Sequence, residues 1–291
     1  MVKDILAIRN MCRSEIDILV DWADHEGWNP GRHDAEVFWE TNPEAFIAAE
    51  VQKGLIGAGS IASYGGNYGF MGFFIIRPEY RGFGFGRKLW YLMCERMLER
   101  LRPGASVGLD AAFQMQNFYA KGGFVFSHRN LRFCMEIPIE NKLNDTRNHE
   151  VLPLTEIPFT QLLEYDTSCF STQRARFLRA WLCQKDSRAL GLVQSGELRG
   201  YGLIRRCRTG FKVGPLFANT IKVADSLLVE LASFASGNSI FLDVPENNPK
   251  AMELTQRYNM KEIFGCARMY LGSIPNVAHE RIFGVTTFEL G

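Results

Sequence analysis

The sequence has 291 residues, of which 46% are hydrophobic and 22% are charged, the balance of a globular protein with a substantial core. Lys and Arg number 33 and Asp and Glu number 32, so no overall field favours nucleic acid or an anionic membrane as a partner. No long apolar run is present and the N-terminal residues are charged, which predicts no membrane span, no signal peptide and a cytoplasmic location.

The first half of the sequence predicts alternating helices and strands. Apolar residues recur at helical spacing over 14–23, and the near-continuous apolar run over 68–76 is typical of a buried central strand. Short runs rich in β-branched residues and bounded by turn residues predict further strands. In chain order we expect helices over 14–23 and 34–40, strands over 45–51, 54–64 and 68–76, a helix over 87–101, a strand over 106–111, a helix over 114–121 and strand material over 124–137.

A polar stretch over 140–150 lacks apolar periodicity and is interpreted as a linker between domains over 1–139 and 150–291. The second half repeats the later part of the element order, and the pair Leu-Asp ends an expected strand in each half. We therefore expect an internal duplication of one unit with a mixed α/β sheet. The expected elements are strands over 211–218, 239–244 and 263–271 and helices over 220–234 and 249–258.

Three glycines stand at alternate positions between the buried strand and the next helix. Glycine tolerates positive φ and lets main-chain N–H groups approach a ligand closely. Together with the unpaired donors of a first helical turn, such N–H groups form a cradle for an anion. Four basic residues around the glycines suit a pyrophosphate. The glycines are Gly82, Gly84 and Gly86, and the basic residues are Arg77, Arg81, Arg87 and Lys88.

A dinucleotide-binding fingerprint is the main alternative for this loop. It needs glycines at relative positions 1, 3 and 6, whereas Arg87 stands where the third is required, and residues 77–80 separate the loop from its strand. Asp110 lies about 25 residues further on, where such a fingerprint places its ribose-binding acid, so this alternative stays open.

The stretch Phe74 to Arg87 resembles the first signature of the GNAT superfamily of N-acetyltransferases, Gln/Arg-x-x-Gly-x-Gly/Ala after a central strand. Arg81, Gly84 and Gly86 fill its three defining positions, and Tyr119 ahead of Gly123-Phe124 resembles the second signature. The signatures and their surroundings cover about residues 1–137.

The second half resembles the extra C-terminal domain of a two-domain branch of this superfamily. Residues 211–234 contain no Arg-x-x-Gly-x-Gly, so this domain is expected to lack the cofactor loop. The matching segments are residues 214–218, 242–245, 248 and 267–270, together with residues 27–31 near the start.

The resemblance implies a duplicated GNAT-type acyl-CoA acyltransferase fold that uses acetyl-CoA to acetylate a small-molecule or amino-acid-like primary amine by direct transfer. Main-chain groups near Phe74, Ile75 and Ile76 would pair with the pantetheine arm. No metal is expected, because the seven cysteines are scattered and form no Cys-x-x-Cys pair. The loop residues that would hold the phosphates are Arg81, Gly82, Phe83, Gly84, Phe85, Gly86 and Arg87.

Tyr119 is predicted to be the general acid that protonates the leaving thiolate, with a ring that packs under the cofactor as the alternative. The general base is predicted to be Asp110 or Glu26, each acting through water; Asp110 capping a turn and Glu26 being solvated are the alternatives. Residues 24–34 are expected to line the acceptor pocket, where Glu26, Trp28 and Asp34 would suit an amine. Residues 159–181 and 268–270 are expected to close it.

A second hypothesis is a catalytically silent acyl-CoA-binding or scaffolding protein, since the duplicated half lacks a loop of its own. The expected partner is a small amine rather than nucleic acid or a membrane. The sequence leaves the oligomeric state open, a homodimer included.

Overall fold

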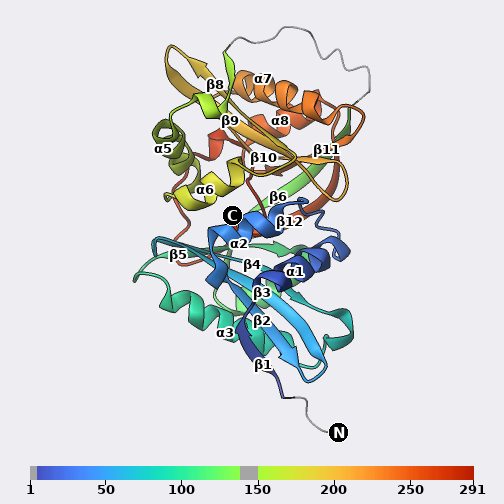
Figure 1. Ribbon diagram of the computed structural model, residues 1–291. Coiled ribbons are helices and arrows are strands. Elements are labelled where there is room, and N and C mark those ends of the chain that lie inside the picture. Colours follow the sequence, from blue (N-terminus) through green and yellow to red (C-terminus); the bar gives the residue numbers. More distant parts are fainter. Residues whose placement is uncertain (1–4, 138–149) are drawn as a thin grey trace.

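The computed structural model describes residues 5–137 and 150–291. The first half contains a mixed sheet with helices on both faces (Figure 1). Most of the predicted linker falls outside the described residues. The elements are β1 (Ala7–Asn10), α1 (Arg13–His25), α2 (Asp34–Thr41), β2 (Phe46–Val51), β3 (Gly54–Tyr64), β4 (Tyr68–Ile76), α3 (Phe85–Glu99), β5 (Ser106–Ala112), α4 (Gln116–Lys121) and β6 (Val125–Glu136), with short 3₁₀ turns η1 (Pro43–Ala45), η2 (Pro78–Tyr80) and η3 (Phe113–Met115).

The second half repeats this arrangement from its first strand onward, because the elements from β7 to β12 follow the same order as those from β1 to β6. All the predicted helices and strands of both halves are present, with ends shifted by at most two residues, whereas β1, α5, α6, β7, β8, β9 and β13 were not predicted. The elements are β7 (Val151–Pro153), α5 (Phe159–Phe170), α6 (Ala175–Leu182), β8 (Ser187–Gln194), β9 (Glu197–Arg206), β10 (Phe211–Ala218), α7 (Ile221–Ala232), β11 (Ser239–Pro245), α8 (Pro249–Arg257), β12 (Lys261–Leu271) and β13 (Ile282–Gly284), with η4 (Leu154–Glu156), η5 (Ser233–Ala235) and η6 (His279–Arg281).

The alternation of side chains along the strands creates the layers of the first half. On β2, Phe46 and Ala48 pack with α1 and α2, whereas Ile47 and Ala49 face the opposite side and pack with α3. Successive residues of a strand point to opposite faces, so an apolar strand of this kind requires a helix layer on each side. Helix α3 supplies Leu89, Trp90, Met93 and Met97 to its layer, all of them buried.

The two halves exchange strands. β12, from the second half, lies between β5 and β6, and β6, from the first half, lies between β12 and β11. The strand order is β1-β2-β3-β4-β5-β12-β6-β11-β10-β9-β8-β7, with β13 paired to β10. One sheet therefore runs through both halves, and each half is completed by a strand of the other (Figure 1). The proposed boundary between domains over 1–139 and 150–291 remains a prediction.

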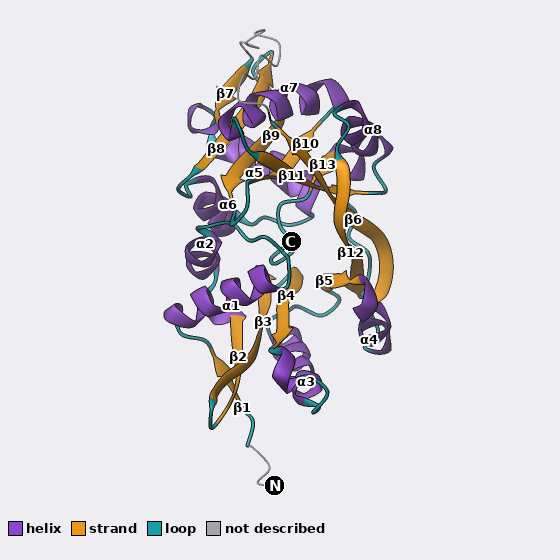
Figure 2. Ribbon diagram, turned by 90° about the vertical axis from the view of Figure 1, so that its right-hand side faces the viewer, coloured by secondary structure: helices purple, strands orange, loops and turns teal. Residues whose placement is uncertain are grey.

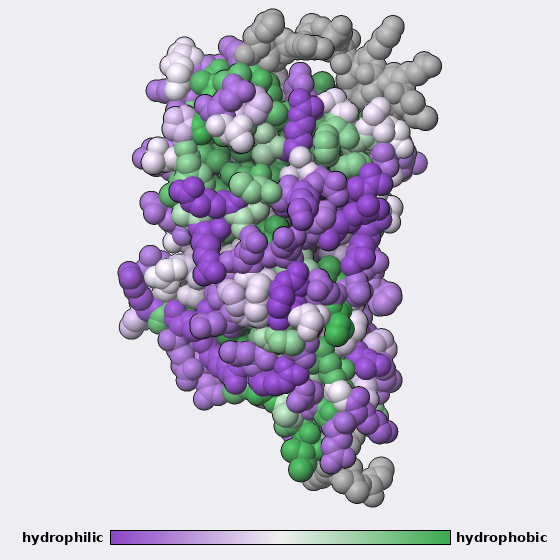
Figure 3. Space-filling view, viewed as in Figure 1, coloured by the Kyte–Doolittle hydropathy of each residue, from purple (hydrophilic) through white to green (hydrophobic). Residues whose placement is uncertain are grey.

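Helices and the C-terminal segment also join the halves. The rings of Phe38 on α2 and Trp181 on α6 stack with centroids 6.0 Å apart, and buried Asp34 forms an ion pair with buried Arg205 at 2.9 Å. Figure 2 shows the C-terminal end of the chain between the two halves. Around this junction, the face shown in Figure 3 is mostly hydrophilic. No helix in the described part of the chain is long and apolar enough to cross a membrane.

Candidate active site

Strand β4 parts from its neighbour β5 halfway along its length. The two strands pair in parallel only over Tyr68–Met71. Beyond this point β4 contains one more residue than β3 opposite it, since Ala58 pairs with Ile75 and Ser60 with Gly72. Such a bulge bends the strand. On the side that faces β5, residues 72–76 consequently have no strand partner among the described residues.

Phe73 stands at the bulge with φ of +51°, an uncommon value for a non-glycine residue. Its buried ring packs against Phe38 (centroids 5.6 Å apart), Phe46 (6.5 Å) and Trp28 (6.4 Å). A backbone conformation of this kind costs about 1–3 kcal/mol and persists only where the surroundings enforce it. The aromatic cluster around Phe73 thus stabilises the bulged conformation of β4.

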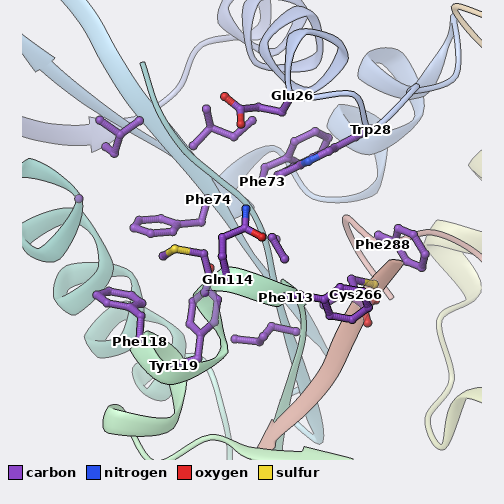
Figure 4. A pocket seen from close by; sticks show the side chains of 18 of the residues that line it. Glu26, Trp28, Phe73, Phe74, Phe113, Gln114, Phe118, Tyr119, Cys266 and Phe288 are labelled. Atoms are coloured by element: carbon purple, nitrogen blue, oxygen red, sulfur yellow. The ribbon is translucent and has the colours of Figure 1, made fainter. Parts of the chain in front are cut away.

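A cleft of about 1310 Å³ occupies the space between the separated strands. Figure 4 shows side chains from β4, η3, α4, β12, the loop after α1 and the C-terminal segment around it. Phe85 lies outside the lining, because its ring packs beside Tyr80 with centroids 6.4 Å apart. The other predicted site residues all line this cleft, namely Glu26, Phe74, Ile75, Ile76, Arg81, Gly82, Phe83, Gly84, Gly86, Arg87, Asp110 and Tyr119.

The glycine loop presents free main-chain donors at one end of the cleft. Gly82 and Gly84 have φ of +83° and +84°, and a Cβ at either position would meet no atom within 4 Å. Gly84 caps the N-terminus of α3, and no side chain accepts a hydrogen bond there. Among the described residues, the N–H groups of residues 82–87 have no hydrogen-bond partner. Such a group of N–H donors at a helix N-terminus binds anions.

Two cations stand free beside these donors. Arg87 and Lys88, both exposed on the first turn of α3, have no ion-pair partner in the described part of the chain. Arg77 instead pairs with Glu79. An N-terminal helix turn is a poor place for basic residues unless an anion is bound, because the helix dipole is positive there. The composition of this turn fits the pyrophosphate of a nucleotide.

Arg81 links the loop to the segment after α1. Its Nε donates to the carbonyl of Ile76 at 2.7 Å, and its Nη2 donates to Glu26. Glu26 is therefore the partner of a cation, which counts against its predicted role as a base. Glu26 is exposed, as its solvated alternative expects, and it forms a salt bridge with Arg81.

Asp110 is engaged still more completely. Its side chain is fully buried and accepts two hydrogen bonds from Arg268, at 2.8 and 2.7 Å, and one from Asn130 at 2.9 Å. The bidentate ion pair fixes this buried carboxylate against Arg268, away from solvent. Only the rest of this residue borders the cleft, so the geometry also counts against Asp110 as the base.

Tyr119 lies on α4 at the wall of the cleft, where aromatic side chains surround it. It packs against Trp90 with centroids 4.9 Å apart and against Phe118 at 5.3 Å. Burial, with a smaller effect of Cys94, raises the pKa of Tyr119 well above its usual value. Its hydroxyl consequently stays protonated at neutral pH, as a proton or hydrogen-bond donor must.

The exchanged strand β12 and the C-terminal segment form the far wall of the cleft. β12 contributes Phe264, Gly265 and Cys266, and the segment after β13 contributes Phe288. Burial raises the pKa of the Cys266 thiol well above its usual value, so this cysteine is not a nucleophile. A Cβ at Gly72 would collide with the carbonyl of Glu289, which shows how closely this segment lies on β4.

Three predictions about the acceptor pocket are wrong. No residue within 159–181 borders the cleft, because α5 and α6 pack on the other side of the second half's sheet and against α2. Residues 268–270 are also absent from the lining, since they lie further along β12, where the strand is covered. Asp34 is buried in its ion pair with Arg205 and also accepts from the main-chain N–H of Gly31 at 2.7 Å.

The second half fixes the loop that carries Trp28. The carbonyl of Trp28 accepts from Arg132 at 2.7 Å and from Lys212 at 3.3 Å, and Lys212 also donates to the carbonyl of Asn29 at 3.0 Å. Burial, and then Arg132, lowers the pKa of Lys212. Neither Arg132 nor Lys212 lies in a recognisable motif, so their role in fixing this loop could not be predicted from the sequence. The residues that sequence reasoning missed in the lining include Phe113, Gln114, Phe264, Cys266 and Phe288.

Comparison with known proteins agrees with this geometry. A model described as "Acetyltransferase (GNAT) family" matches residues 10–124, and one described as "Acetyltransferase (GNAT) domain" matches residues 162–284. The chain is a two-domain member of the GNAT superfamily. The predicted family and fold are thereby confirmed, and the chain belongs to a family of acyltransferases. Among the described residues, no group of three or more His, Cys, Asp and Glu could hold a metal ion.

Several known proteins match the chain over nearly its whole length. The chain is 27% identical over 278 residues to the holothin acyltransferase of Pseudoalteromonas sp., covering 95% of this chain and 92% of that protein. A crystal structure from Pyrococcus horikoshii superposes with a TM-score of 0.82 at 25% identity and covers 98% and 96% of the two chains. A tandem GNAT protein of the clavulanic acid biosynthesis pathway, 14% identical, shares the fold with a TM-score of 0.64 over 93% and 99%.

Proposed function

We propose that this GNAT protein is an N-acyltransferase that transfers an acetyl group from acetyl-CoA directly to the amine of a small molecule. One observation supports this above all: free N–H donors of the glycine loop, an unpaired stretch of β4 and the Tyr119 hydroxyl face a single cleft. The similarity to an enzyme named for acylating holothin further supports a small-molecule acceptor.

The glycine loop would bind the pyrophosphate through main-chain N–H groups, with Arg87 and Lys88 adding charge. The unpaired edge of β4 at Phe74, Ile75 and Ile76 would pair with the amides of the pantetheine arm as an added strand does. Acetyl-CoA supplies a thioester carbon that an amine can attack. A main-chain N–H of this edge would polarise the thioester carbonyl.

Tyr119 would act where the thiolate leaves. Because a tyrosine hydroxyl is protonated at neutral pH, the side chain can donate to the sulfur as the C–S bond breaks. Glu26 and Asp110 are both paired with arginines, so the second proton, from the attacking amine, would pass to water. The paired carboxylates thus assist neither the attack nor the departure.

Release of free thiol from acetyl-CoA in the presence of a panel of small amines tests this function. The wild-type protein should show acceptor-dependent thiol release, and Tyr119→Phe should lower kcat at least about tenfold, or about 1.4 kcal/mol, with little change in acetyl-CoA affinity. Saturable acetyl-CoA binding without turnover of any amine, unaffected by this substitution, would instead identify a silent acyl-CoA-binding protein.

A further inference from the structure

The aromatic end of the cleft identifies the chemical class of the acceptor. Building on the proposed function, we infer that the acceptor is a planar aromatic or heteroaromatic amine that is uncharged at neutral pH. Three observations carry this inference: the rings that enclose the acceptor end, the pairing of the carboxylates that border the cleft, and the positive charge behind the rings.

Rings from separate segments enclose the acceptor end. Trp28 follows α1, Phe113 belongs to η3, and Phe288 lies in the C-terminal segment; Figure 4 shows them around the same part of the cleft. Phe288 also packs beside Phe264 of β12, with centroids 6.3 Å apart and planes tilted by 35°. Trp28 and Phe288 are half-buried and Phe113 is 40% exposed, so each keeps ring surface open to the cleft. Such a lining stacks flat, apolar ligands.

Among the described residues that line the cleft, no buried carboxylate is left without a cationic partner to hold an ammonium group. Three carboxylates border the cleft, of which Glu26 is paired with Arg81 and Asp110 with Arg268. Glu262, the third, is exposed at the beginning of β12 and remains hydrated. A cationic amine entering this site would lose water without gaining a buried partner.

Positive charge lies directly behind the aromatic wall. The guanidinium of buried Arg132 stands 5.2 Å from the ring centroids of both Phe264 and Phe288. Arg132 is balanced by Asp243 through hydrogen bonds of 2.6 and 2.8 Å and also interacts with the buried carboxylate of Glu289, and Lys212 lies close by, donating to the same carbonyl of Trp28. A ring already facing one cation is a poor partner for a second on its other face, whereas it still stacks with a neutral ring.

A neutral acceptor also removes the need for a base. An alkylamine is only about one part in a thousand neutral at pH 7, because its pKa is near 10. The nitrogen of an arylamine is uncharged there, since its lone pair is delocalised into the ring. The amine nitrogen forms the C–N bond, the C–S bond breaks, Tyr119 protonates the sulfur, and water takes the proton that nitrogen loses and returns one to Tyr119, which leaves an aryl amide and a free thiol.

Matched pairs of acceptors test the inference. Each pair has one carbon skeleton in aromatic and in saturated form, for example 4-methylaniline and 4-methylcyclohexylamine, and kcat/KM with acetyl-CoA is measured from pH 6 to pH 9. We expect at least a tenfold preference for the aromatic members and a nearly flat pH profile for them. A preference for the saturated members, with activity rising tenfold per pH unit, would overturn the inference and leave the proposed function intact. Acetyl-CoA binding with no acylation of any member would instead overturn the proposed function, and the inference with it.

Two variants separate stacking from charge recognition. Phe288→Leu should raise KM for the aromatic amines at least fivefold and leave KM for acetyl-CoA within twofold. Glu26→Gln should change KM for these amines less than threefold, and a tenfold rise would show that the amine binds as a cation. Phe234→Leu is the matched control, because Phe234 is 39% exposed on η5, packs against Phe211 and lies outside the cleft. An equal effect of the control and Phe288→Leu would contradict the stacking role.

Discussion

In each half the central strand separates from its parallel neighbour partway along its length. Only the second half fills the resulting opening with another strand. In the first half, β4 pairs with β5 over Tyr68–Met71 and then leaves a cleft. In the second half, β10 pairs with β11 only over Phe211–Val213, and β13 fills the opening by pairing with β10 at Leu216 and Phe217. The main-chain N–H of Val285, just after β13, donates to the carbonyl of Asp243 on β11 at 2.8 Å.

The helices that follow the two openings differ in how their N-termini are capped. Helix α3 begins at Gly84 without a side-chain cap, whereas Thr220 caps α7 by accepting from the N–H of Val223 at 3.3 Å. Where the first half leaves donors for a ligand, the second half satisfies them with its own atoms. A duplicated fold therefore carries a binding site only where its backbone remains unpaired, and we expect one acyl-CoA per chain.

Separating the halves should have the largest effect. A fragment of residues 1–139 lacks β12 and therefore lacks the strand that covers β5 and the wall formed by Phe264 and Cys266. We expect it to show less than about a hundredth of the full-length acyl-transfer rate and a molten or aggregated state by circular dichroism and gel filtration. Co-expression with residues 150–291 should restore a soluble, active complex. A folded and active fragment, in which β6 pairs with β5, would refute the need for exchange.

Changing the glycine loop tests the donors that the second half lacks. Gly84→Ala should raise the Kd for acetyl-CoA about tenfold, or about 1.4 kcal/mol, because a side chain at positive φ strains the loop and shifts its N–H groups. Gly104→Ala is the matched control, with the same φ of +84° and open space around its Cβ, but remote from the cleft. Both should lose similar thermal stability, and isothermal titration calorimetry should show weaker binding for Gly84→Ala alone.

A buried histidine on the exchanged strand β6 should make the protein less stable in acid. Burial, followed by Arg268 and His279, lowers the pKa of His128 on β6 to about 3. Between pH 6.5 and pH 3 the unfolded chain binds a proton that the folded chain refuses, so stability falls as pH decreases, by at most about 1.4 kcal/mol per pH unit. Urea unfolding of wild type and His128→Gln over this range should give a shallower slope for the variant. Equal slopes would mean that His128 titrates normally.

Removing the cap of the second half should have the smallest effect. Thr220→Ala deletes the oxygen that accepts from Val223 and should lower the free energy of unfolding by about 1 kcal/mol. Acetyl-CoA affinity should be unchanged, since this helix end binds no ligand. A change in affinity measured by calorimetry would indicate that the second half also takes part in binding the donor.

Most of the fold follows from local patterns in the sequence. The alternation along β2 and the apolar stripe of α3 report which faces are buried, and the glycine spacing located the cofactor end of the cleft. The exchange of β6 and β12 could not be predicted, because the apolar pattern of each strand would fit equally well in either half of the sheet. The acceptor end was missed for a related reason: Phe264 and Phe288 are far from the signatures in sequence and reach the cleft only through that exchange.

Synthesis from the N-terminus gives the position of β12 a further consequence. When residues 1–137 have left the ribosome, Lys261–Leu271 has not yet been made, so the free edge of β5 is available to any passing strand. The nascent chain can close this edge with its native partner only after residues 261–271 have also emerged. Shielding by a chaperone during that interval, rather than the final stability, would then set the yield of native protein.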